Sequence, residues 1–499
     1  MEQKNTWVEV PISEAKGAIL PGMWVFRRKR TPDGTIKKYK GRYCVRGDLQ
    51  KGDFETFAPV VAFSTVRLFL ILSIILGWKS CSIDFSNAFV QAKLNDPVWI
   101  HLPRGFHAAS SYTKTCLKLK KSLYGLSIAP RLWYTHLFKA LKECGFTPSA
   151  NDPCFLMKKE MFIILYVDDA GCAYSDEGVL NDLIDSLVSK GFELTREGTF
   201  SEYLGIKFEA NSSGNVSMTQ QGLIKKIIKS MDLEDCNPNR TPSLKEALGM
   251  DTDGPSMSDT WSYPSVVGML LYLSGNTRPD ITFAVSQVAR FTHASKQSHA
   301  IAVKRIARYL AGTSTMGIIV CMSSGLSLTS YVDADFAGLY KRDPDHEPTS
   351  AKSRTGYIIK LGDCPLVWKS QLQHGICLST SESEYSALSQ NMRVLLPIRD
   401  ILLEFVQIVN IPSNLHSVNN TINTTVHEDN SSALLLATNQ RITSRTRYYN
   451  VKWHFFWDHV KKGNIKVVKV ASADQCADYL TKGLVIVIFE RCRKLNQGW

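Results

Sequence analysis

The segment from Phe162 to Ser175, FIILYVDDAGCAYS, places two adjacent aspartates, Asp168 and Asp169, between two apolar stretches. Each stretch suits a buried strand, so the sequence predicts a β-hairpin with carboxylates at its tip. Two anions at the end of such strands are costly unless cations neutralise them. Magnesium prefers oxygen ligands of this kind together with substrate phosphates. For an Asp-Asp pair taken alone, a solvated turn or a helix cap is the alternative.

Asp84 repeats this arrangement in CSIDFSNAFV, where an acid ends another short apolar stretch. A strand at Asp84 can pair beside the hairpin, and three acids would then converge. Two magnesium ions about 3.5 to 4 Å apart, held by such acids, stabilise both the attacking and the leaving oxygen in phosphoryl transfer. A helix N-cap is the alternative for Asp84 alone.

The chain of 499 residues is too long for one core and predicts two to four domains of mixed α and β structure. A basic hairpin is expected over 24–47, turning at Pro32-Asp33-Gly34, with helices over 64–77 and 131–145. Residues 236–260 read as a connector and 412–425 as a surface loop. Between and after these, the patterns predict helices over 263–311, a strand from 326, a hairpin over 356–370, helices from about 381 and near 477, and a strand at 425.

The charge of the chain favours polyanionic partners. Lys and Arg number 59 against 46 Asp and Glu, a formal net charge of +13. Cations paired with phosphates release counterions, although a solvated basic surface is the alternative. The twelve cysteines form no C-x-x-C pair, so reduced thiols are expected. No signal peptide is evident, and the apolar run 68–76 is too short to cross a bilayer, so an intracellular protein without membrane contact is expected.

A second set of acids is spread over the C-terminal part of the chain. The four contexts are YVDADF, SESEYSAL, VHEDNSSAL and ADYLTKGL, which contain Asp333, Glu384, Asp429 and Asp478. Asp335 and Glu382 compete with Asp333 and Glu384 for the same roles. Four acids in one small domain predict a second metal site.

Several ordered motifs resemble one family. LKKSLYGLSIAPRLW, SIDFSNAFVQAKL and ILYVDDA are similar to the reverse transcriptase of copia-like retrotransposon polyproteins. KYKGRYCVRGDLQ and FSEYLGIKF resemble its fingers and thumb, and YPSVVGMLLYLSGNTRPDITFAVSQVARF resembles the segment that joins it to ribonuclease H. The resemblance implies an α+β multidomain protein, a right-hand polymerase of fingers, palm and thumb followed by a ribonuclease H-like mixed α/β domain. The implied domains are 1–235 (reverse transcriptase), 236–325 (linker and helical connection) and 326–499 (ribonuclease H-like).

The resemblance also implies roles for individual residues. Asp84 and Asp168 would bind the catalytic metals, and Asp169 would complete the acidic cluster. Phe89 would stack under the incoming sugar, with a core aromatic as the alternative role. The other implied nucleotide-binding residues are Arg42, Tyr124 and Gly125, of which Arg42 would contact the triphosphate, unless it is a simple surface cation.

The implied enzyme is an RNA-directed DNA polymerase with an associated ribonuclease H. Asp333, Glu384, Asp429 and Asp478 would hold the ions of the second site, where water attacks the RNA strand of an RNA–DNA hybrid. The cofactor would be Mg²⁺, two ions per site, with Mn²⁺ as a substitute. The partners would be an RNA template, a DNA primer, the hybrid and deoxynucleoside triphosphates.

Departures from the family pattern support an alternative function. Ser127 and Ile128 stand where polar or basic residues are usual, and Tyr448 and Asn450 stand where the family has His and Asp. No segment resembles capsid, protease or integrase, which suggests a processed product, a truncated copy or a host-retained fragment. The alternative is therefore a decayed copy that binds nucleic acid without catalysis. Location in a cytoplasmic virus-like particle or in the nucleus, the primer, self-association and expression are left open by the sequence.

Overall fold

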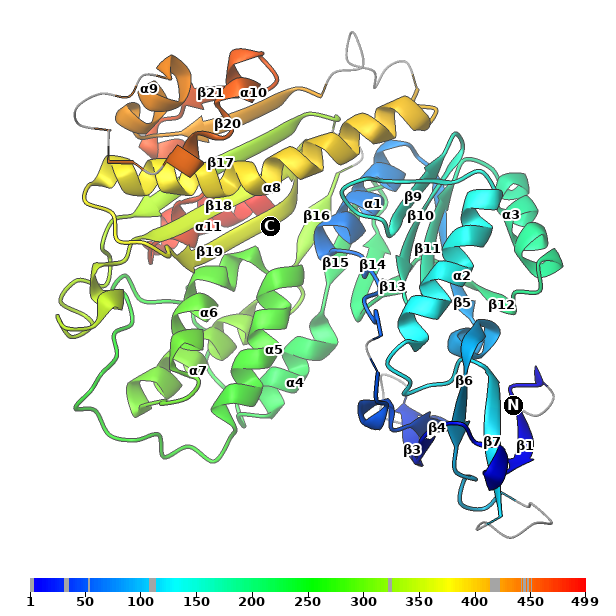
Figure 1. Ribbon diagram of the computed structural model, residues 1–499. Helices are drawn as coiled ribbons and strands as arrows, with labels where there is room; N and C mark the ends of the chain where they lie inside the picture. The colour runs from blue at the N-terminus through cyan, green and yellow to red at the C-terminus, as the bar shows by residue number, and fades with distance from the viewer. Residues whose placement is uncertain are drawn as a thin grey trace. The chain divides into compact units, whose positions relative to one another are not determined.

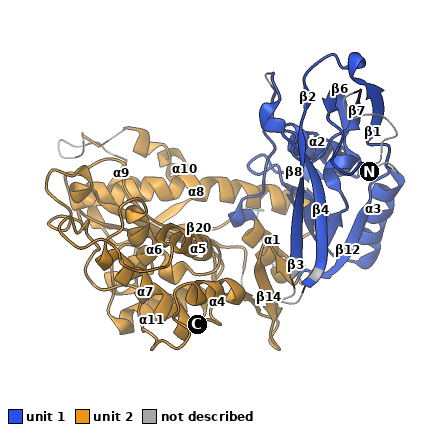
Figure 2. Cartoon of the chain, turned by 90° about the horizontal axis from the view of Figure 1, so that it is seen from below, with its two compact units in different colours: residues 1–65, 78–200 blue, residues 66–77, 201–499 orange. Residues whose placement is uncertain are grey.

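The computed structural model describes residues 4–30, 36–52, 54–106, 114–321, 325–412, 422–440, 442, 446, 448–449 and 451–499. The predicted turn at Pro32-Asp33-Gly34, most of the predicted loop 412–425 and Asn450 lie outside these residues. The chain divides into two compact units, which Figure 2 shows in blue and orange. Unit 1 comprises residues 1–65 and 78–200, and unit 2 comprises 66–77 and 201–499.

A six-stranded antiparallel sheet in the order β12-β5-β11-β10-β9-β8 forms the centre of unit 1 (Figure 1). On β5, Cys81, Ile83 and Phe85 are buried and alternate with half-buried residues, as a strand with one core face requires. Trp133 of helix α2 packs edge-on against Phe85. The elements are β5 (Lys79–Phe85), β8 (Thr147–Pro148), β9 (Phe155–Lys158), β10 (Met161–Tyr166), β11 (Asp169–Tyr174), β12 (Leu194–Thr199), α2 (Ala129–Glu143) and α3 (Glu177–Ser189).

Two smaller sheets complete unit 1. Four strands pair in the order β1-β7-β6-β2, and β3 and β4 form the basic hairpin that the sequence predicted. The elements are β1 (Trp7–Pro11), β2 (Ile19–Leu20), β3 (Gly22–Arg30), β4 (Ile36–Val45), β6 (Lys93–Ile100), β7 (Thr115–Lys121), η2 (Ile12–Glu14), η3 (Gly47–Leu49) and η4 (Ala88–Gln91).

Unit 2 begins with a helical group and a four-stranded sheet in the order β13-β14-β15-β16. The guanidinium of Arg67, on α1, donates to the carbonyl of Leu366 and lies over the ring of Trp368. The elements are α1 (Phe63–Ile75), β13 (Glu202–Tyr203), β14 (Ile206–Ala210), β15 (Val216–Thr219), α4 (Gln221–Lys229), α5 (Tyr263–Asn276), η5 (Pro279–Ile281), α6 (Thr282–Val288), η6 (Ala289–Phe291), α7 (Gln297–Gly312) and β16 (Ile318–Val320). Residues 230–262 contain no helix or strand, in agreement with the predicted connector.

The second sheet of unit 2 has the order β19-β18-β17-β20-β21. β17, β18 and β19 are antiparallel, whereas β20 and β21 run parallel to β17, and the long helix α8 packs along the sheet (Figure 1). The elements are β17 (Leu328–Asp335), η7 (Pro348–Ala351), β18 (Arg354–Leu361), β19 (Cys364–Leu372), α8 (Thr380–Ile408), β20 (Thr424–Glu428), α9 (Ser431–Asn439), η8 (Val451–His454), α10 (Trp457–Lys461), β21 (Lys466–Lys469), η9 (Ser472–Asp474), η10 (Asp478–Leu480) and α11 (Ile486–Gln497).

The mixed α/β character predicted from the sequence is confirmed. The helix expected near Ala477 is not, because ADYL forms only the single 3-10 turn η10 and the closing helix α11 begins at Ile486. The compact units divide after Phe200. The division at 235 and 325 and the right-hand arrangement stay predictions.

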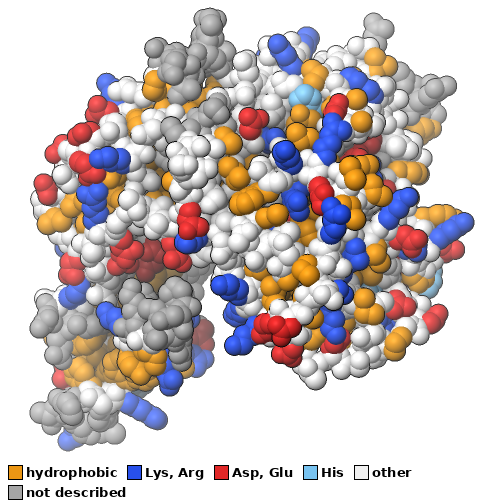
Figure 3. Space-filling model, turned by 180° about the vertical axis from the view of Figure 1, so that it is seen from behind, with side chains coloured by type: hydrophobic (Ala, Val, Ile, Leu, Met, Phe, Trp, Pro, Cys, Tyr) orange, Lys and Arg blue, Asp and Glu red, His pale blue; other side chains and the backbone are white. Residues whose placement is uncertain are grey.

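The cationic residues are not gathered in a single stripe on the face seen in Figure 3. Lys and Arg side chains there are spread among acidic and apolar ones. The net charge of +13 therefore does not by itself show where on the surface a polyanion would bind.

Candidate active sites

The strands β5 and β11 bring Asp84 and Asp169 together as direct partners in their antiparallel register. Phe85 N–H donates to the carbonyl of Asp168 at 3.0 Å, so the pair 85/168 is hydrogen-bonded and the next pair, 84/169, is not. Non-hydrogen-bonded pairs have the closer Cα spacing, about 4.5 Å, and their side chains share one face. Two half-buried carboxylates therefore oppose each other directly, an arrangement that a cation between them would stabilise.

Asp168 lies in the two-residue turn between β10 and β11. Val167 precedes it with φ of 58°, which is rare for a β-branched residue and marks local backbone strain. The indole Nε1 of Trp133 donates to the Val167 carbonyl at 2.6 Å, and the Phe85 amide holds the Asp168 carbonyl. Both hydrogen bonds hold the backbone of the turn in place and therefore fix the position from which the Asp168 side chain projects. The sequence did not single out Trp133, although it lies in the LKKSLYGLSIAPRLW motif.

The residues predicted to bind nucleotide form a chain of contacts in unit 1. The Arg42 guanidinium lies 4.9 Å from the ring centroid of Tyr124, and the Phe89 ring meets Tyr124 edge-on at 5.0 Å. Burial raises the pKa of the Tyr124 hydroxyl, the Arg42 cation lowers it, and the charges of Asp168 and Asp84 raise it further. Tyr124 is thus electrostatically coupled to the acids at the strand ends.

A cavity of about 550 Å³ opens beside this chain of contacts. Arg42 and Tyr124 line it with Asn87, and further aromatic walls come from Trp7, Trp24, Tyr43 and Phe106. Phe89 does not line it, and instead packs half-buried against the hydrophobic core around Tyr43 and Leu123. The contacts of Phe89 thus match the core-aromatic alternative, and its role at the incoming sugar stays a prediction.

Gly125 is required by the fold itself. Its φ is +91°, and a Cβ there would lie 2.1 Å from the carbonyl oxygen of Val45. The amide of Val45 bonds the Tyr124 carbonyl, and the amide of Gly47 bonds the Gly125 carbonyl. Any side chain at 125 would break this backbone contact. The glycine therefore has a local structural reason that is independent of its predicted role in nucleotide binding.

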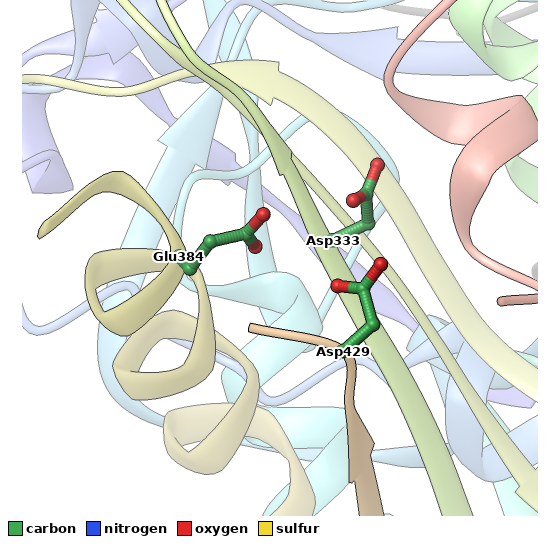
Figure 4. A group of neighbouring side chains, drawn as sticks. All are labelled: Asp333, Glu384 and Asp429. Atoms are coloured by element: carbon green, nitrogen blue, oxygen red, sulfur yellow. The ribbon is translucent and has the colours of Figure 1, made fainter. Parts of the chain in front are cut away.

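Three acids of the second set gather in unit 2. Asp333 lies on β17, Glu384 on α8 and Asp429 just after β20, and Figure 4 shows their carboxylates turned toward a common space. One carboxylate oxygen from each lies within 4.8 Å of the other two. Among the described residues this is the one group of three such ligands, so the side chains of Asp84, Asp168 and Asp169 are not drawn together to the same degree.

Burial and mutual repulsion strongly raise the pKa values of two of these acids. Burial is the main cause that raises the pKa of Asp333 to about 6 and that of Glu384 to about 11, and neighbouring carboxylates add to both shifts. The Glu384 Oε2 atom is buried with no hydrogen-bond partner. A buried carboxylate oxygen without a donor, facing two further carboxylates, fits a divalent cation that prefers oxygen ligands.

Asp478 joins this group through a lysine that it shares with Asp333. Lys482 Nζ lies 3.0 Å from Asp478 Oδ1 and 3.9 Å from Asp333 Oδ2, so one cation faces both carboxylates. Thr481 donates its hydroxyl proton to Asp333. All four predicted acids are thus neighbours, although Lys482 already pairs with the fourth.

The structure separates the competing acids. Glu382 Oε2 accepts the amide of Leu378 at 2.7 Å, and the Glu382 amide donates to Ser379, so Glu382 closes the N-terminus of α8. Asp335 ends β17, and its carboxylate does not belong to the group of three. The geometry therefore places Asp333 and Glu384, and not Asp335 or Glu382, in the group of three, and the roles of these acids stay predictions.

Glu428 is a neighbour that the sequence analysis missed. It is fully buried at the end of β20, its Oε1 accepts the amide of Asn430, and its Oε2 has no hydrogen-bond partner. Burial raises its pKa to about 8, and the charges of Asp429 and Asp333 contribute. The motif VHEDN contained it beside Asp429, but an acid within a strand gives no sequence signal of its depth.

Comparison with known proteins identifies the relatives of the chain. Residues 4–245 match the family described as reverse transcriptase (RNA-dependent DNA polymerase). The chain is 32% identical over 97% of its length to the retrovirus-related Pol polyprotein from transposon RE1 of Arabidopsis thaliana. The chain belongs to the reverse transcriptase family of copia-like retrotransposon Pol polyproteins.

Two other relatives agree with this membership. The Pol polyprotein from transposon RE2 of Arabidopsis thaliana is 31% identical over 97% of the chain, and that from TNT 1-94 of Nicotiana tabacum is 31% identical over 99%. The chain spans 32% of the RE1 and RE2 polyproteins and 37% of the TNT 1-94 polyprotein, about a third of each. None of its described helices combines the length and apolar character needed to cross a membrane.

Proposed function

We propose that the chain is an RNA-directed DNA polymerase with an associated ribonuclease H. The observation that carries the proposal is the register that sets Asp84 opposite Asp169, beside Asp168, within the residues that match the reverse transcriptase family. In this proposal the six-stranded sheet is the palm, the β3–β4 hairpin belongs to the fingers, β13 to α4 form the thumb, and the sheet around β17 is the ribonuclease H domain.

At the first site, Asp84, Asp168 and Asp169 would hold Mg²⁺ or Mn²⁺. Ions held there would supply activation of the primer hydroxyl and neutralisation of the charge on the leaving pyrophosphate. The chain itself supplies rigidity, since the turn is held by Trp133 and the Phe85 amide. Preorganised ligands avoid the cost of reorganisation when the phosphodiester forms.

Substrate selection would use the contacts around Tyr124. The Arg42 cation would pair with the triphosphate of a deoxynucleoside triphosphate, and the Phe89 ring would leave no room for a 2′-hydroxyl. Tyr124 and Gly125 would lie beside the nucleotide. The cavity of about 550 Å³ next to Arg42 is of the size that small-molecule sites have.

At the second site, Asp333, Glu384, Asp429 and Asp478 would hold the ions that activate water for hydrolysis of the RNA strand of an RNA–DNA hybrid. The unpartnered Glu384 Oε2 supports this role. Lys482 would have to yield its contact with Asp478 when a cation binds. Hydrolysis would remove the copied template.

Nucleic-acid binding would depend on phosphate contacts. On the β3–β4 hairpin, Arg27 and Lys40 are direct partners in the register and therefore share a face. Binding of a primer–template should weaken steeply as salt is added, because each cation paired with a phosphate releases counterions. An affinity that does not change with salt concentration would show that the chain does not bind nucleic acid through phosphate contacts.

Primer extension on an RNA template with Mg²⁺ tests the first site. Asp168→Asn should abolish extension while primer–template binding stays intact or tightens, because one metal-holding charge is lost. Asp185→Asn, an exposed aspartate of α3, is the matched control and should extend normally. Incorporation that persists in Asp168→Asn would reject the metal assignment.

Cleavage of the RNA strand of a labelled hybrid tests the second site. The wild type should cleave with Mg²⁺ and Asp333→Asn should not, whereas Asp458→Asn, which removes an exposed charge paired with Lys462, should match the wild type. Equal cleavage by the wild type and Asp333→Asn would reject this role. Binding without either activity would favour the decayed copy that only binds nucleic acid.

A further inference from the structure

Two buried cysteines face each other across the central strands of unit 1. Cys81 on β5 and Cys172 on β11 are direct partners in the antiparallel register. Both are free thiols, 1% and 0% exposed, and as direct partners they project from the same face of the sheet. Their side chains lie on the opposite face of the sheet from Asp84 and Asp169, since each is three positions from the acid on its strand.

The backbone spacing at this pair suits a disulfide. The hydrogen-bonded and non-hydrogen-bonded pairs alternate along an antiparallel ladder, and the pair 85/168 is hydrogen-bonded. Cys81 and Cys172 lie four positions further along each strand, so they form a pair of the same kind, with a Cα spacing of about 5.5 Å. Disulfides usually join Cα atoms about 4.4 to 6.8 Å apart. A bond between the two sulfurs therefore needs no change of strand register. It does need the Cβ atoms, about 5.5 Å apart in a hydrogen-bonded pair, to approach to the roughly 3.5 to 4.5 Å of a disulfide.

The surroundings make Cys81 the more reactive thiol. The hydrogen bond from Cys172 is the main cause that holds the pKa of Cys81 below its ordinary value, and the Arg196 cation also lowers it. The same hydrogen bond and burial raise the pKa of Cys172. Since the thiolate is the nucleophile, the opposite shifts of the two pKa values favour Cys81 over Cys172 as the attacking thiol.

The strand that pairs with β5 beside Cys81 is irregular at that position. β12 is an edge strand, and its pairing with β5 shifts between Glu197 and Thr199, where Thr199 opposes Cys81. Residues 195–199 are exposed. A bulge at a sheet edge interrupts the ladder, and such short edge strands open locally more readily than central strands. Local opening of β12 would admit a small oxidant to the Cys81 sulfur.

We propose that Cys81 and Cys172 form an oxidation site for hydrogen peroxide, with Cys81 as the attacking thiol and Cys172 as the resolving thiol. The Cys81 thiolate attacks one peroxide oxygen, so that an S–O bond forms, the O–O bond breaks, and the departing hydroxide takes up a proton as water. The Cys172 sulfur then attacks the Cys81 sulfur, the S–S bond forms, and the S–O oxygen leaves as water with the Cys172 proton. Two thiols are oxidised and one peroxide is reduced to water.

Peptide mapping of the full chain tests this site. The reduced protein is treated with hydrogen peroxide, unreacted thiols are alkylated under denaturing conditions, and the digest is examined by mass spectrometry. We expect a cross-linked peptide pair joining Cys81 to Cys172, lighter by two hydrogen atoms than the separate peptides and released by dithiothreitol. The readout is a covalent bond, so it stands whether or not the chain polymerises DNA.

Alanine variants provide the controls. Cys81→Ala and Cys172→Ala should each abolish the linked peptide, whereas Cys154→Ala, which removes a buried thiol whose pKa is raised to about 12, should retain it. If an alanine variant fails to fold, the wild-type map still decides the question. Recovery of both cysteines as alkylated thiols from peroxide-treated wild type would overturn the proposal. So would a bond from Cys81 to another cysteine, or oxidation of Cys81 that stops at the sulfinic acid.

Discussion

Replacing Glu384 by glutamine should stabilise the metal-free protein. Burial, reinforced by the charges of Asp333, Glu428 and Asp429, raises the pKa of Glu384 to about 11. In the unfolded chain the same carboxyl group is ionised at pH 7, because its ordinary pKa is 4.5. Folding at pH 7 without a cation must therefore take up a proton at Glu384.

The size of this effect follows from linkage. Below pH 4.5 a carboxyl group with a raised pKa does not lower the free energy of unfolding, because it is protonated in both the folded and the unfolded state. As the pH rises above that value, the folded state loses stability. The interval of about 2.5 pH units up to neutrality corresponds to about 3 kcal/mol at 1.36 kcal/mol per unit. This figure is an upper limit, because the neighbouring acids share the same repulsion. Glutamine has nearly the same shape and carries no charge in either state, so the penalty disappears.

Calorimetry in a metal chelator at pH 5 and pH 7 measures the effect. Each kcal/mol corresponds to roughly 2 to 4 °C in Tm for a unit of this size, so Glu384→Gln should melt several degrees higher than the wild type at pH 7. The difference should shrink at pH 5. Added Mg²⁺ should raise the Tm of the wild type by mass action and raise that of the variant less.

Glu382→Gln is the matched control in the same helix turn. Its side chain accepts the Leu378 amide, so losing the charge should leave the stability unchanged or slightly lower at both pH values. Our reasoning fails if Glu384→Gln is no more stable than the wild type at pH 7 in chelator. It fails as well if the two glutamine variants respond alike to pH and to Mg²⁺.

Three further substitutions probe the framework of the two units. Asp280→Asn should cost about 3 to 5 kcal/mol in denaturant unfolding, because it leaves the fully buried Arg278 without its ionised partner; a loss below about 1 kcal/mol would contradict this. Gly125→Ala should lower the Tm and slow primer extension, since the backbone there has positive φ and touches a neighbouring carbonyl, and unchanged values of both would refute the argument. Trp133→Phe should cost about 1 kcal/mol and slow extension by releasing the Val167 carbonyl, and normal extension would show that the turn needs no such anchor.

The local sequence determined much of the secondary structure. Alternating burial on β5, the apolar strands on either side of Asp168 and the turn signals of the basic hairpin are properties of neighbouring residues, so their pattern predicts strands directly. The same local patterns predicted α8 and the irregular connector. They overestimated the helix near Asp478, because ADYL supports only one 3-10 turn before the backbone turns into α11.

Only the tertiary structure decided which acids meet. The sequence motif favoured Glu384 with Glu382 as a close competitor, and only the way α8 lies on the sheet turns Glu384 toward Asp333 while Glu382 caps the helix. The sequence likewise did not predict that Glu428 is buried beside these acids. The physical reason is that strand register and helix placement follow from contacts between residues far apart in the chain, where a shift of one position would turn each side chain to the other face. A local sequence pattern predicts where a helix or strand lies in the chain. The packing of that helix or strand against others decides which of its side chains meet in one site.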